Sequence, residues 1–366
     1  MNIDVLNEVS TEVGKCSGYA EKLNKWAELT VKYCHGLNID KKIDRAFYAF
    51  QSKPCQRPKV LILGLNPMGT ANYESQYNNE LWGLKHAGGM TPDVFVQQNQ
   101  WYHGGRYAKE EKGWNILNNL KKTTEVHSDL QDLFDEDKIV YMNILYFNSK
   151  DFAEFKISAG THWKEIYETC VQLSKGLIFE IIKPERILCL GIDNCYKSFT
   201  APYNSEVLIP GALLKTEMNN TPVYGMIHPS ARISNAKRKF IGLNLYASLF
   251  DKPIVEDLEE RFLGALKLVA KNNGLHLYRK TKKLSVKFGD FYFQSDEKNI
   301  VLQFEFQNAL YSDLRYGLYE NDWLNSAKKC QHPYNDWTNL IEDFDEPAFH
   351  KYFDDIVKIH MNKLKQ

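Results

Sequence analysis

Three short apolar runs in this sequence are each followed by a polar residue that could take part in a reaction. Asn66 follows the run VLIL, Asn143 follows IVYM, and His228 follows VYGMI. An asparagine can orient a water molecule but cannot take its proton, and its amide can pair with a donor and an acceptor on a cyclic imide. A neutral histidine can donate a hydrogen bond to negative charge that develops on a leaving group. If the three strands lie in one parallel sheet, we expect these residues to converge on one rim.

Each of these residues also has an ordinary structural interpretation. An asparagine that precedes a proline, as Asn66 does, commonly serves only its own turn. A buried asparagine such as Asn143 could tie two loops together, provided that both ends of its amide find partners. A lone histidine at the end of a strand is usually a structural hydrogen-bonding residue. Each residue taken alone leaves both interpretations open.

A compact basic cluster follows His228 in the stretch HPSARISNAKRK. Basic side chains and helix N-termini both bind phosphate groups, so the cluster could hold a nucleic-acid backbone beside the histidine. The commoner interpretation of such a cluster is a solvated helical face. The residues of this stretch that we consider as DNA contacts are Ser230, Arg232, Ile233, Lys237 and Arg238.

A parallel sheet would bring the polar residues together. Continuous apolar runs separated by segments of helical length are typical of strands that are buried on both faces. The sequence predicts four such strands, at Val60 to Leu63, Ile139 to Met142, Ile187 to Leu190, and Val223 to Ile227. It predicts helices in residues 4 to 35, 114 to 120, 163 to 182 and 236 to 250. The expected fold is α/β, with three α/β/α layers around a central four-stranded parallel sheet, whose ligand site lies beyond the carboxyl ends of the strands.

Length and composition suggest two domains and no membrane segment. At 366 residues, the sequence suits residues 1 to 250 as one domain and residues 251 to 366 as a smaller C-terminal α+β domain. Lys plus Arg and Asp plus Glu both total 46, so any nucleic-acid contact must be a local patch. The 7 cysteines form no Cys-x-x-Cys pair, which argues against a structural zinc site. No apolar run approaches ~18 residues, and we expect a cytoplasmic protein without a membrane segment.

Three stretches in chain order, GLNPMG, MNILYF and HPSARISNAK, resemble motifs of the uracil-DNA glycosylase superfamily. The closest likeness is to the single-strand-selective monofunctional branch, in which the first motif is Gly-Met-Asn-Pro-Gly and the last is His-Pro-Ser-Pro-Arg-Asn. The likeness covers Lys59 to Phe250. It implies the fold of that superfamily for this part of the chain.

The resemblance also implies roles for the polar residues at the strand ends. Asn66 matches the residue that places the attacking water, and His228 matches the histidine that stabilises negative charge on O2 of the base. Asn143 matches the asparagine that reads the imide edge of uracil. Arg232 or Ile233 falls where the superfamily has the wedge that enters the DNA helix as the base leaves it.

Further residues would line the base pocket. By the resemblance these are Gly64, Leu65, Met68, Tyr73 and Trp82. Met68 occupies a position that is Tyr in one branch, where it bars the methyl group of thymine, and Gly in the closest branch. Asn79 stands where the family has the Phe that stacks on the base, so Tyr73, Trp82 or Tyr77 would have to supply that stacking.

The resemblance implies a monofunctional DNA glycosylase that flips a base out of DNA and hydrolyses its N-glycosidic bond. The base would be uracil or a related damaged or modified base, no cofactor or metal is expected, and turnover should be slower than in relatives with Asp at the position of Asn66. One alternative is a catalytically inactive sensor of modified or single-stranded nucleic acid, within a host–phage defence system. Another is a binder of free nucleobases or nucleotides. We expect the C-terminal domain to contact DNA or a protein partner, and the protein to be associated with the nucleoid if it is bacterial.

Overall fold

The computed structural model of the chain describes most of its first 253 residues and, beyond these, mainly four strands. The described residues are 1–67, 69, 71–74, 90–97, 115–134, 138–233, 235–253, 268, 271–272, 276–280, 290–294, 300–307 and 313–320. The chain divides into two compact units, Met1–Ala231 and Arg232–Gln366. The domain boundary predicted after residue 250 therefore lies within the second unit.

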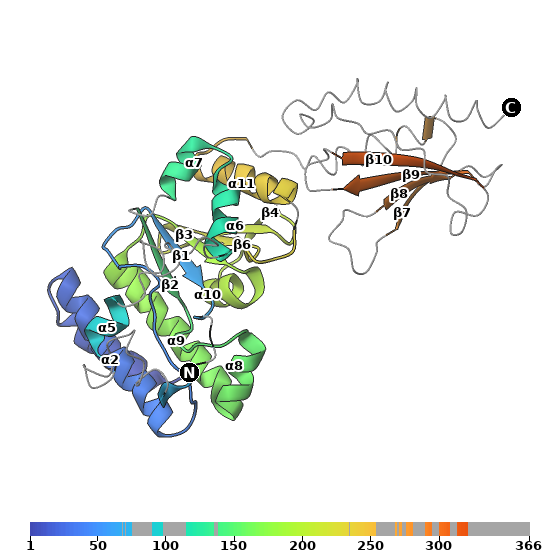
Figure 1. Ribbon diagram of the computed structural model, residues 1–366. Coiled ribbons are helices and arrows are strands. Elements are labelled where there is room, and N and C mark those ends of the chain that lie inside the picture. Colours follow the sequence, from blue (N-terminus) through green and yellow to red (C-terminus); the bar gives the residue numbers. More distant parts are fainter. Residues whose placement is uncertain are drawn as a thin grey trace. The chain divides into compact units, whose positions relative to one another are not determined.

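The first unit is built on a mixed six-stranded sheet (Figure 1). Its strands are β1 (Val60–Gly64), β2 (Ile139–Asn143), β3 (Ile187–Leu190), β4 (Glu206–Ile209), β5 (Leu213–Met218) and β6 (Thr221–Met226). They lie in the order β2-β1-β3-β6-β5-β4. The α/β class is confirmed, and the four predicted strands are β1, β2, β3 and β6, which pair in parallel. The predicted sheet of four strands is wrong, because β5 and β4 extend it in antiparallel pairing.

The two additional strands arise from a tight hairpin between β5 and β6. Asn219 and Asn220 join these strands with positive φ angles of 49° and 59°. This combination is typical of a two-residue type I′ turn, whose twist matches that of the paired strands, and asparagine tolerates it well. The hairpin places β5 beside β6, where the next strand of a purely parallel sheet would lie.

Helices precede and connect the strands of the first unit. They are α1 (Ile3–Gly14), α2 (Tyr19–Ile39), α5 (Pro92–Gln97), α6 (Asn115–Thr124), α7 (Ser128–Leu133), α8 (Phe152–Ala159), α9 (Trp163–Gly176) and α10 (Lys197–Thr200), with the short helical turns η4 (Gly160–His162), η5 (Leu177–Ile182) and η6 (Ile192–Tyr196). The predicted opening helices are confirmed as α1 and α2, and the helix predicted over residues 163 to 182 is α9 followed by η5. The short helices α7 and α8 were not predicted.

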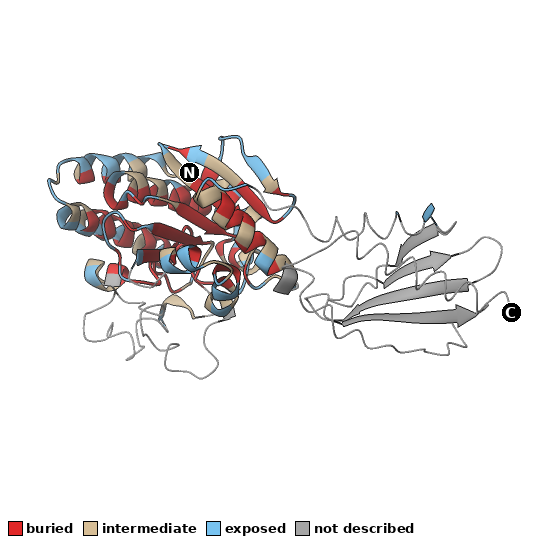
Figure 2. Ribbon diagram, turned by 90° about the horizontal axis from the view of Figure 1, so that it is seen from above, coloured by how far each residue is buried: buried red, intermediate tan, exposed pale blue. Residues whose placement is uncertain are grey.

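Both faces of the parallel strands are buried, which explains why their sequences are continuously apolar. One face packs into the main apolar core with Trp26 of α2 and contributes Leu61, Leu63, Val140, Met142, Ile187, Cys189 and Val223. The other face carries Ile62, Tyr141, Leu188 and Tyr224, which are also buried. Figure 1 shows α2 and α9 on one side of the sheet and α6 and α7 on the other, and Figure 2 shows the buried strands between partly exposed helices.

The second unit contains a helix and a separate four-stranded sheet. The helix is α11 (Asn235–Leu249), close to the prediction over residues 236 to 250. The antiparallel sheet has the order β10-β9-β8-β7, with β7 (His276–Lys280), β8 (Asp290–Gln294), β9 (Ile300–Gln307) and β10 (Asp313–Glu320). The remaining parts of the predicted C-terminal α+β domain lie outside the described residues. Among the helices that the structure describes in either unit, none is both long and apolar enough to cross a membrane.

Candidate functional site at the carboxyl edge of the sheet

The four parallel strands bring the polar residues of the first unit to one edge of the sheet. Asn143 is the last residue of β2, Asn66 lies two residues after β1, and His228 lies two residues after β6. Neighbouring strands lie about 4.8 Å apart, so these four strand ends span roughly 14 Å. Gly191 follows β3 between them, and a Cβ at this glycine would lie 3.9 Å from Cδ2 of His228. The sheet therefore positions Asn66, Asn143 and His228 along one rim.

The side chain of Asn66 has a fixed orientation. Its Nδ2 donates to the carbonyl oxygens of Pro67 and Ser149 at 3.0 and 2.8 Å, and to Oγ of Ser149 at 2.9 Å. The oxygen and nitrogen of a side-chain amide are often difficult to tell apart. Here the assignment is clear, because Oδ1 of Asn66 in the place of Nδ2 would face two carbonyl oxygens at these distances. Nδ2 must therefore face the loop that contains Ser149, and Oδ1 must face away from it.

The outward-facing oxygen of Asn66 is available as an acceptor. Within the described part of the chain, no group donates a hydrogen bond to Oδ1, although Asn66 itself is half-buried. An amide oxygen in this position can accept a proton of a water molecule and so aim the water's lone pair, but it cannot remove a proton. The geometry of Asn66 thus suits the orientation of a water molecule.

Asn143 is buried against Gly64, its neighbour on β1. Gly64 and Asn143 are partners in the parallel register, and Asn143 is only 1% exposed. Its Nδ2 has no hydrogen-bond partner among the described residues. A buried donor without a partner costs about 1–3 kcal/mol, unless a ligand or water supplies an acceptor. The amide of Asn143 is therefore a candidate group for binding a polar ligand.

Gly64 makes room for this amide, and we expect Gly64→Ala to impair ligand binding. A Cβ at Gly64 would lie 2.7 Å from Oδ1 of Asn143 and 3.1 Å from the ring of Tyr141. The methyl group would push the amide of Asn143 out of place, at a cost of about 1–3 kcal/mol in stability. A binding titration with a uracil-containing oligonucleotide should show affinity reduced about tenfold or more.

The control for this prediction is Gly14→Ala, because Gly14 lies in α1 and nothing approaches within 4 Å of a Cβ placed there. Affinity of Gly64→Ala equal to that of the wild type would show that Asn143 does not contact the ligand.

The backbone continues to pair beyond the ends of β1 and β2. The amides of Ile144 and Leu145 donate to the carbonyls of Gly64 and Leu65 at 3.0 and 2.8 Å. These bonds hold the loop after β1, which carries Asn66, against the loop after β2. Of the predicted base-binding residues, the structure thus places Gly64, Leu65 and Asn143 side by side.

His228 is held as a neutral donor. The backbone N–H of Ser230 donates to Nδ1 at 3.2 Å, and the N–H of Ala231 donates to the carbonyl of His228 at 2.8 Å, closing a turn. Burial lowers the pKa of His228 below its ordinary value of 6.5. Because Nδ1 accepts a hydrogen bond, the proton of the neutral ring resides on Nε2. His228 can therefore donate from Nε2 to a ligand without carrying charge.

Tyr73, a predicted pocket residue, packs against α2 and the segment that follows it. Its ring is nearly parallel to that of Phe47, with 6.3 Å between centroids, and its hydroxyl contacts Nδ1 of His35. Its backbone N–H donates to Oδ1 of Asp44 at 3.1 Å. Tyr73 is thus fixed against α2 and the segment between α2 and β1. The other predicted pocket residues, Met68, Trp82 and Tyr77, lie outside the described residues.

The predicted DNA contacts fall into both units. Ser230 is exposed and belongs to the first unit, whereas Arg232, Ile233, Lys237 and Arg238 belong to the second. Nζ of Lys237 lies 4.9 Å from the centre of the Phe240 ring. Arg238 is only 7% exposed, so its placement does not favour a direct phosphate contact.

Sequence inspection overlooked the residues that hold Asn66. Ser149 is fully buried, and its loop leads into α8. The sequence did contain a signal in DFAE, since an Asp followed three residues later by Glu is typical of the first turn of a helix. Asp151 is the N-cap of α8 and accepts from the N–H of Glu154 at 2.8 Å.

In the described parts of the chain, including this rim, no group of three or more His, Cys, Asp or Glu residues could hold a metal ion.

Comparison with protein-family profiles and with curated protein sequences finds no match.

Proposed function

We propose that the protein is a monofunctional DNA glycosylase of the uracil-DNA glycosylase type. The observation that carries this proposal is the orientation of Asn66, whose Nδ2 is committed to the loop of Ser149 while Oδ1 faces outward as a free acceptor. The order of the three motifs and the parallel strands that carry them also support it, as do helices on both sides of the sheet, which suit the α/β/α layers of that superfamily.

The reaction would break the bond between C1′ of the sugar and the nitrogen of a flipped base. The base would leave with the bonding electron pair, and the N–H of His228 Nε2 would stabilise the negative charge on it. Water oriented by Asn66 would bond to C1′, and its proton would pass to the departing base or to solvent. Since the sugar gains positive character as the bond breaks, the water needs correct placement more than deprotonation, which an amide can supply.

Asn143 would recognise the base in this scheme. The unpartnered Nδ2 would donate to a carbonyl of the base and Oδ1 would accept from its imide N–H, a combination that suits uracil and disfavours cytosine. The partner would be DNA, bound as a single strand or as a duplex from which the base is flipped at a cost of a few kcal/mol. The second unit would contact DNA or a protein partner.

The amide at position 66 also favours a second candidate function. A protein that binds uracil-containing or single-stranded nucleic acid without cleaving it would need the recognition group Asn143 but no strong base for water. Such a sensor could serve in host–phage defence. It would bind without releasing the base, with affinity that falls as salt rises.

A measurement of base release distinguishes the glycosylase from the sensor. The substrates are labelled oligonucleotides, single-stranded or duplex, that contain uracil, hypoxanthine, a thymine mismatch or an oxidised pyrimidine. Strand cleavage by alkali at the resulting abasic site reports release. Release from at least one substrate supports the glycosylase, and tight binding without release of any base contradicts it in favour of the sensor.

A further inference from the structure

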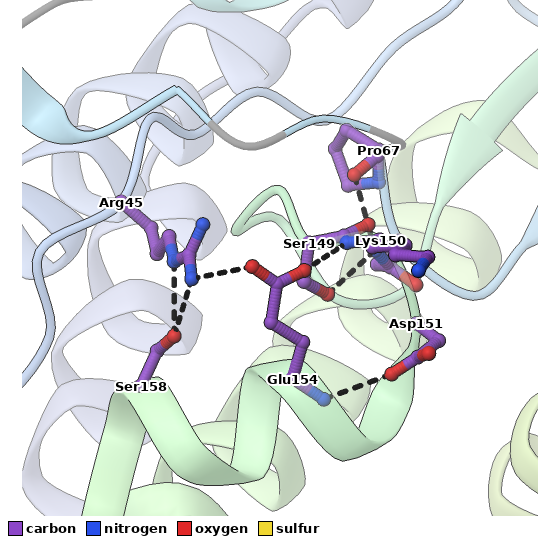
Figure 3. Close-up of polar contacts among 8 residues, drawn as sticks. Arg45, Pro67, Ser149, Lys150, Asp151, Glu154 and Ser158 are labelled. Carbon is purple, nitrogen blue, oxygen red and sulfur yellow. Dashed lines mark hydrogen bonds and ion pairs between the residues drawn. The ribbon is translucent and has the colours of Figure 1, made fainter.

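The loop that holds Asn66 is itself held by Glu154, the third residue of α8. The backbone N–H of Lys150 donates to Oε2 of Glu154 at 2.6 Å, and the N–H of Glu154 donates to Oδ1 of Asp151 at 2.8 Å. The two bonds close the first turn of α8, as in a capping box, except that the carboxylate accepts from Lys150, the residue before the N-cap Asp151. Figure 3 shows Ser149 and Lys150 drawn against the start of this helix. The loop is held at Ser149 by the bond from its backbone N–H to the carbonyl of Pro67 at 3.1 Å, and at the next residue, Lys150, by the carboxylate of Glu154.

Arg45 holds the other oxygen of this carboxylate. Nη2 of Arg45 donates to Oε1 of Glu154 at 2.8 Å, and Nε and Nη2 both donate to Oγ of Ser158 at 3.0 and 2.7 Å (Figure 3). The backbone N–H of Arg45 donates to Oδ1 of Asn38 at 3.0 Å, which ties it to α2. Arg45 thus joins α2 to α8 through the side chain of Glu154.

The contact between Arg45 and Glu154 is partly shielded from water. The two side chains are 14% and 28% exposed, less than either partner in most ion pairs on the described surface. The N–H of Lys150 has the largest effect on the pKa of Glu154 and lowers it; burial opposes this shift, and the guanidinium of Arg45 adds to it, so that the pKa lies below its ordinary value. A partly buried contact of this kind, in which each carboxylate oxygen has its own donor, fixes geometry better than an exposed pair of flexible chains.

We propose that Glu154 and Arg45 are positioning residues for the hydrolysis, acting through Ser149 on the amide of Asn66. This inference rests on the proposed function. The chain of contacts runs from Arg45 to Glu154, from Glu154 to the backbone of Lys150, and from the adjoining Ser149 to Nδ2 of Asn66. Because Nδ2 determines where Oδ1 points, a shift of the Ser149 loop changes the place of the attacking water. Neither residue touches the substrate.

The test is Glu154→Gln, with Arg45→Lys as a second variant in case the first does not fold. Glutamine offers one oxygen where glutamate offers two, so it can accept from Lys150 or from Arg45 but not from both. A displacement of 1 Å or less at a reacting group costs up to about 10²-fold in rate. We expect kcat for base release to fall roughly tenfold while KM changes less than twofold, since binding of the base does not involve Glu154.

Glu185→Gln is the matched control. The carboxylate of Glu185 also has two cationic partners, Lys59 at 2.6 Å and Arg186 at 3.2 Å, but it precedes β3 and so lies at the opposite edge of the sheet. Its substitution should leave kcat unchanged. If the loss of any ion pair reduced activity, both Glu154→Gln and Glu185→Gln would be less active than the wild type.

The double variant Glu154→Gln with Asn66→Ala separates positioning from general stabilisation. If Glu154 acts through Asn66, its substitution should cause no further loss of kcat once Asn66 is gone. Independent, multiplicative losses in the double variant would overturn the positioning role and leave the proposed function intact. A wild-type protein that releases no base would instead overturn the proposed function, and the positioning role with it.

Discussion

Replacement of His228 by alanine should slow base release about 10²–10³-fold while the protein still binds DNA. In the proposed reaction, the neutral N–H at Nε2 would stabilise charge on the departing base, because Nδ1 accepts from the N–H of Ser230. Loss of one donor of this kind costs about 10²–10³-fold in kcat. Single-turnover release from a uracil-containing oligonucleotide measures the loss, and a binding titration of the same oligonucleotide should show little change.

His127→Ala is the matched control for this variant. His127 makes the same local contact, since its Nδ1 accepts from the N–H of Asp129 at 3.2 Å, but it caps α7 and lies away from the strand ends. Its loss should leave base release intact. Equal activity of the His228 and His127 variants would contradict the proposed role of His228.

Acid should inactivate the protein through the same histidine. Protonation of Nδ1 would break the bond from Ser230, and burial disfavours the charged ring, so the pKa of His228 lies below its ordinary value of 6.5. Base release should therefore remain constant as the pH falls through 6.5 and decline only at lower pH. The free energy of unfolding should also decrease in acid. Above the pKa of the unfolded chain, His228 is neutral in both the folded and the unfolded protein. Below that pKa the unfolded chain binds a proton more readily than the folded protein does, so the folded state is destabilised.

Asn66→Asp should be less active than the wild type, although a carboxylate is the stronger activator of water. In the observed orientation, a carboxylate oxygen would replace Nδ2 and face the carbonyls of Pro67 and Ser149 at distances near 3.0 and 2.8 Å. This repulsion should raise the pKa of the new carboxyl group or turn it away from its site. We expect kcat at neutral pH to fall at least tenfold, comparable with the loss in Asn66→Ala, because misplacement of a reacting group can cost about 10²-fold.

The pH dependence of Asn66→Asp distinguishes this explanation from general damage. A protonated carboxyl group can donate to a carbonyl as Nδ2 does, so release by the variant should rise as the pH falls, unlike release by Asn66→Ala. Because the folded-state pKa is raised, stability relative to the wild type should be highest in acid and should decrease as the pH rises through that pKa. Faster release by Asn66→Asp than by the wild type at neutral pH would show that the Ser149 loop does not exclude a carboxylate.

The parallel part of the sheet was predictable because burial on both faces leaves a simple pattern. The runs at β1, β2, β3 and β6 contain almost no polar residues, and their spacing leaves room for helices between them. The placement of Asn66 and His228 at strand ends followed directly. The antiparallel extension was missed because β4 and β5 are partly exposed and interrupted by polar residues. Asn219 and Asn220 were a usable signal for this hairpin.

The contacts that hold Asn66 in place were not predictable from the pattern of apolar residues. Ser149 lies 83 residues after Asn66, and Glu154 lies 109 residues after Arg45, so these contacts exist only when the fold is complete. The N-cap of α8 could be read from DFAE, but nothing in that motif indicates that the residue two positions before Asp151 would bind Asn66. The orientation of an amide depends on its neighbours in space, which sequence spacing does not give.

The most direct test of the account is single-turnover release of uracil from labelled single-stranded and duplex oligonucleotides by the wild type, His228→Ala and His127→Ala in parallel. We predict release by the wild type and by His127→Ala, and release that is about 10²–10³-fold slower in His228→Ala with DNA binding retained. Tight binding of the same oligonucleotides by the wild type without any release would contradict the account and identify a nucleic-acid sensor instead.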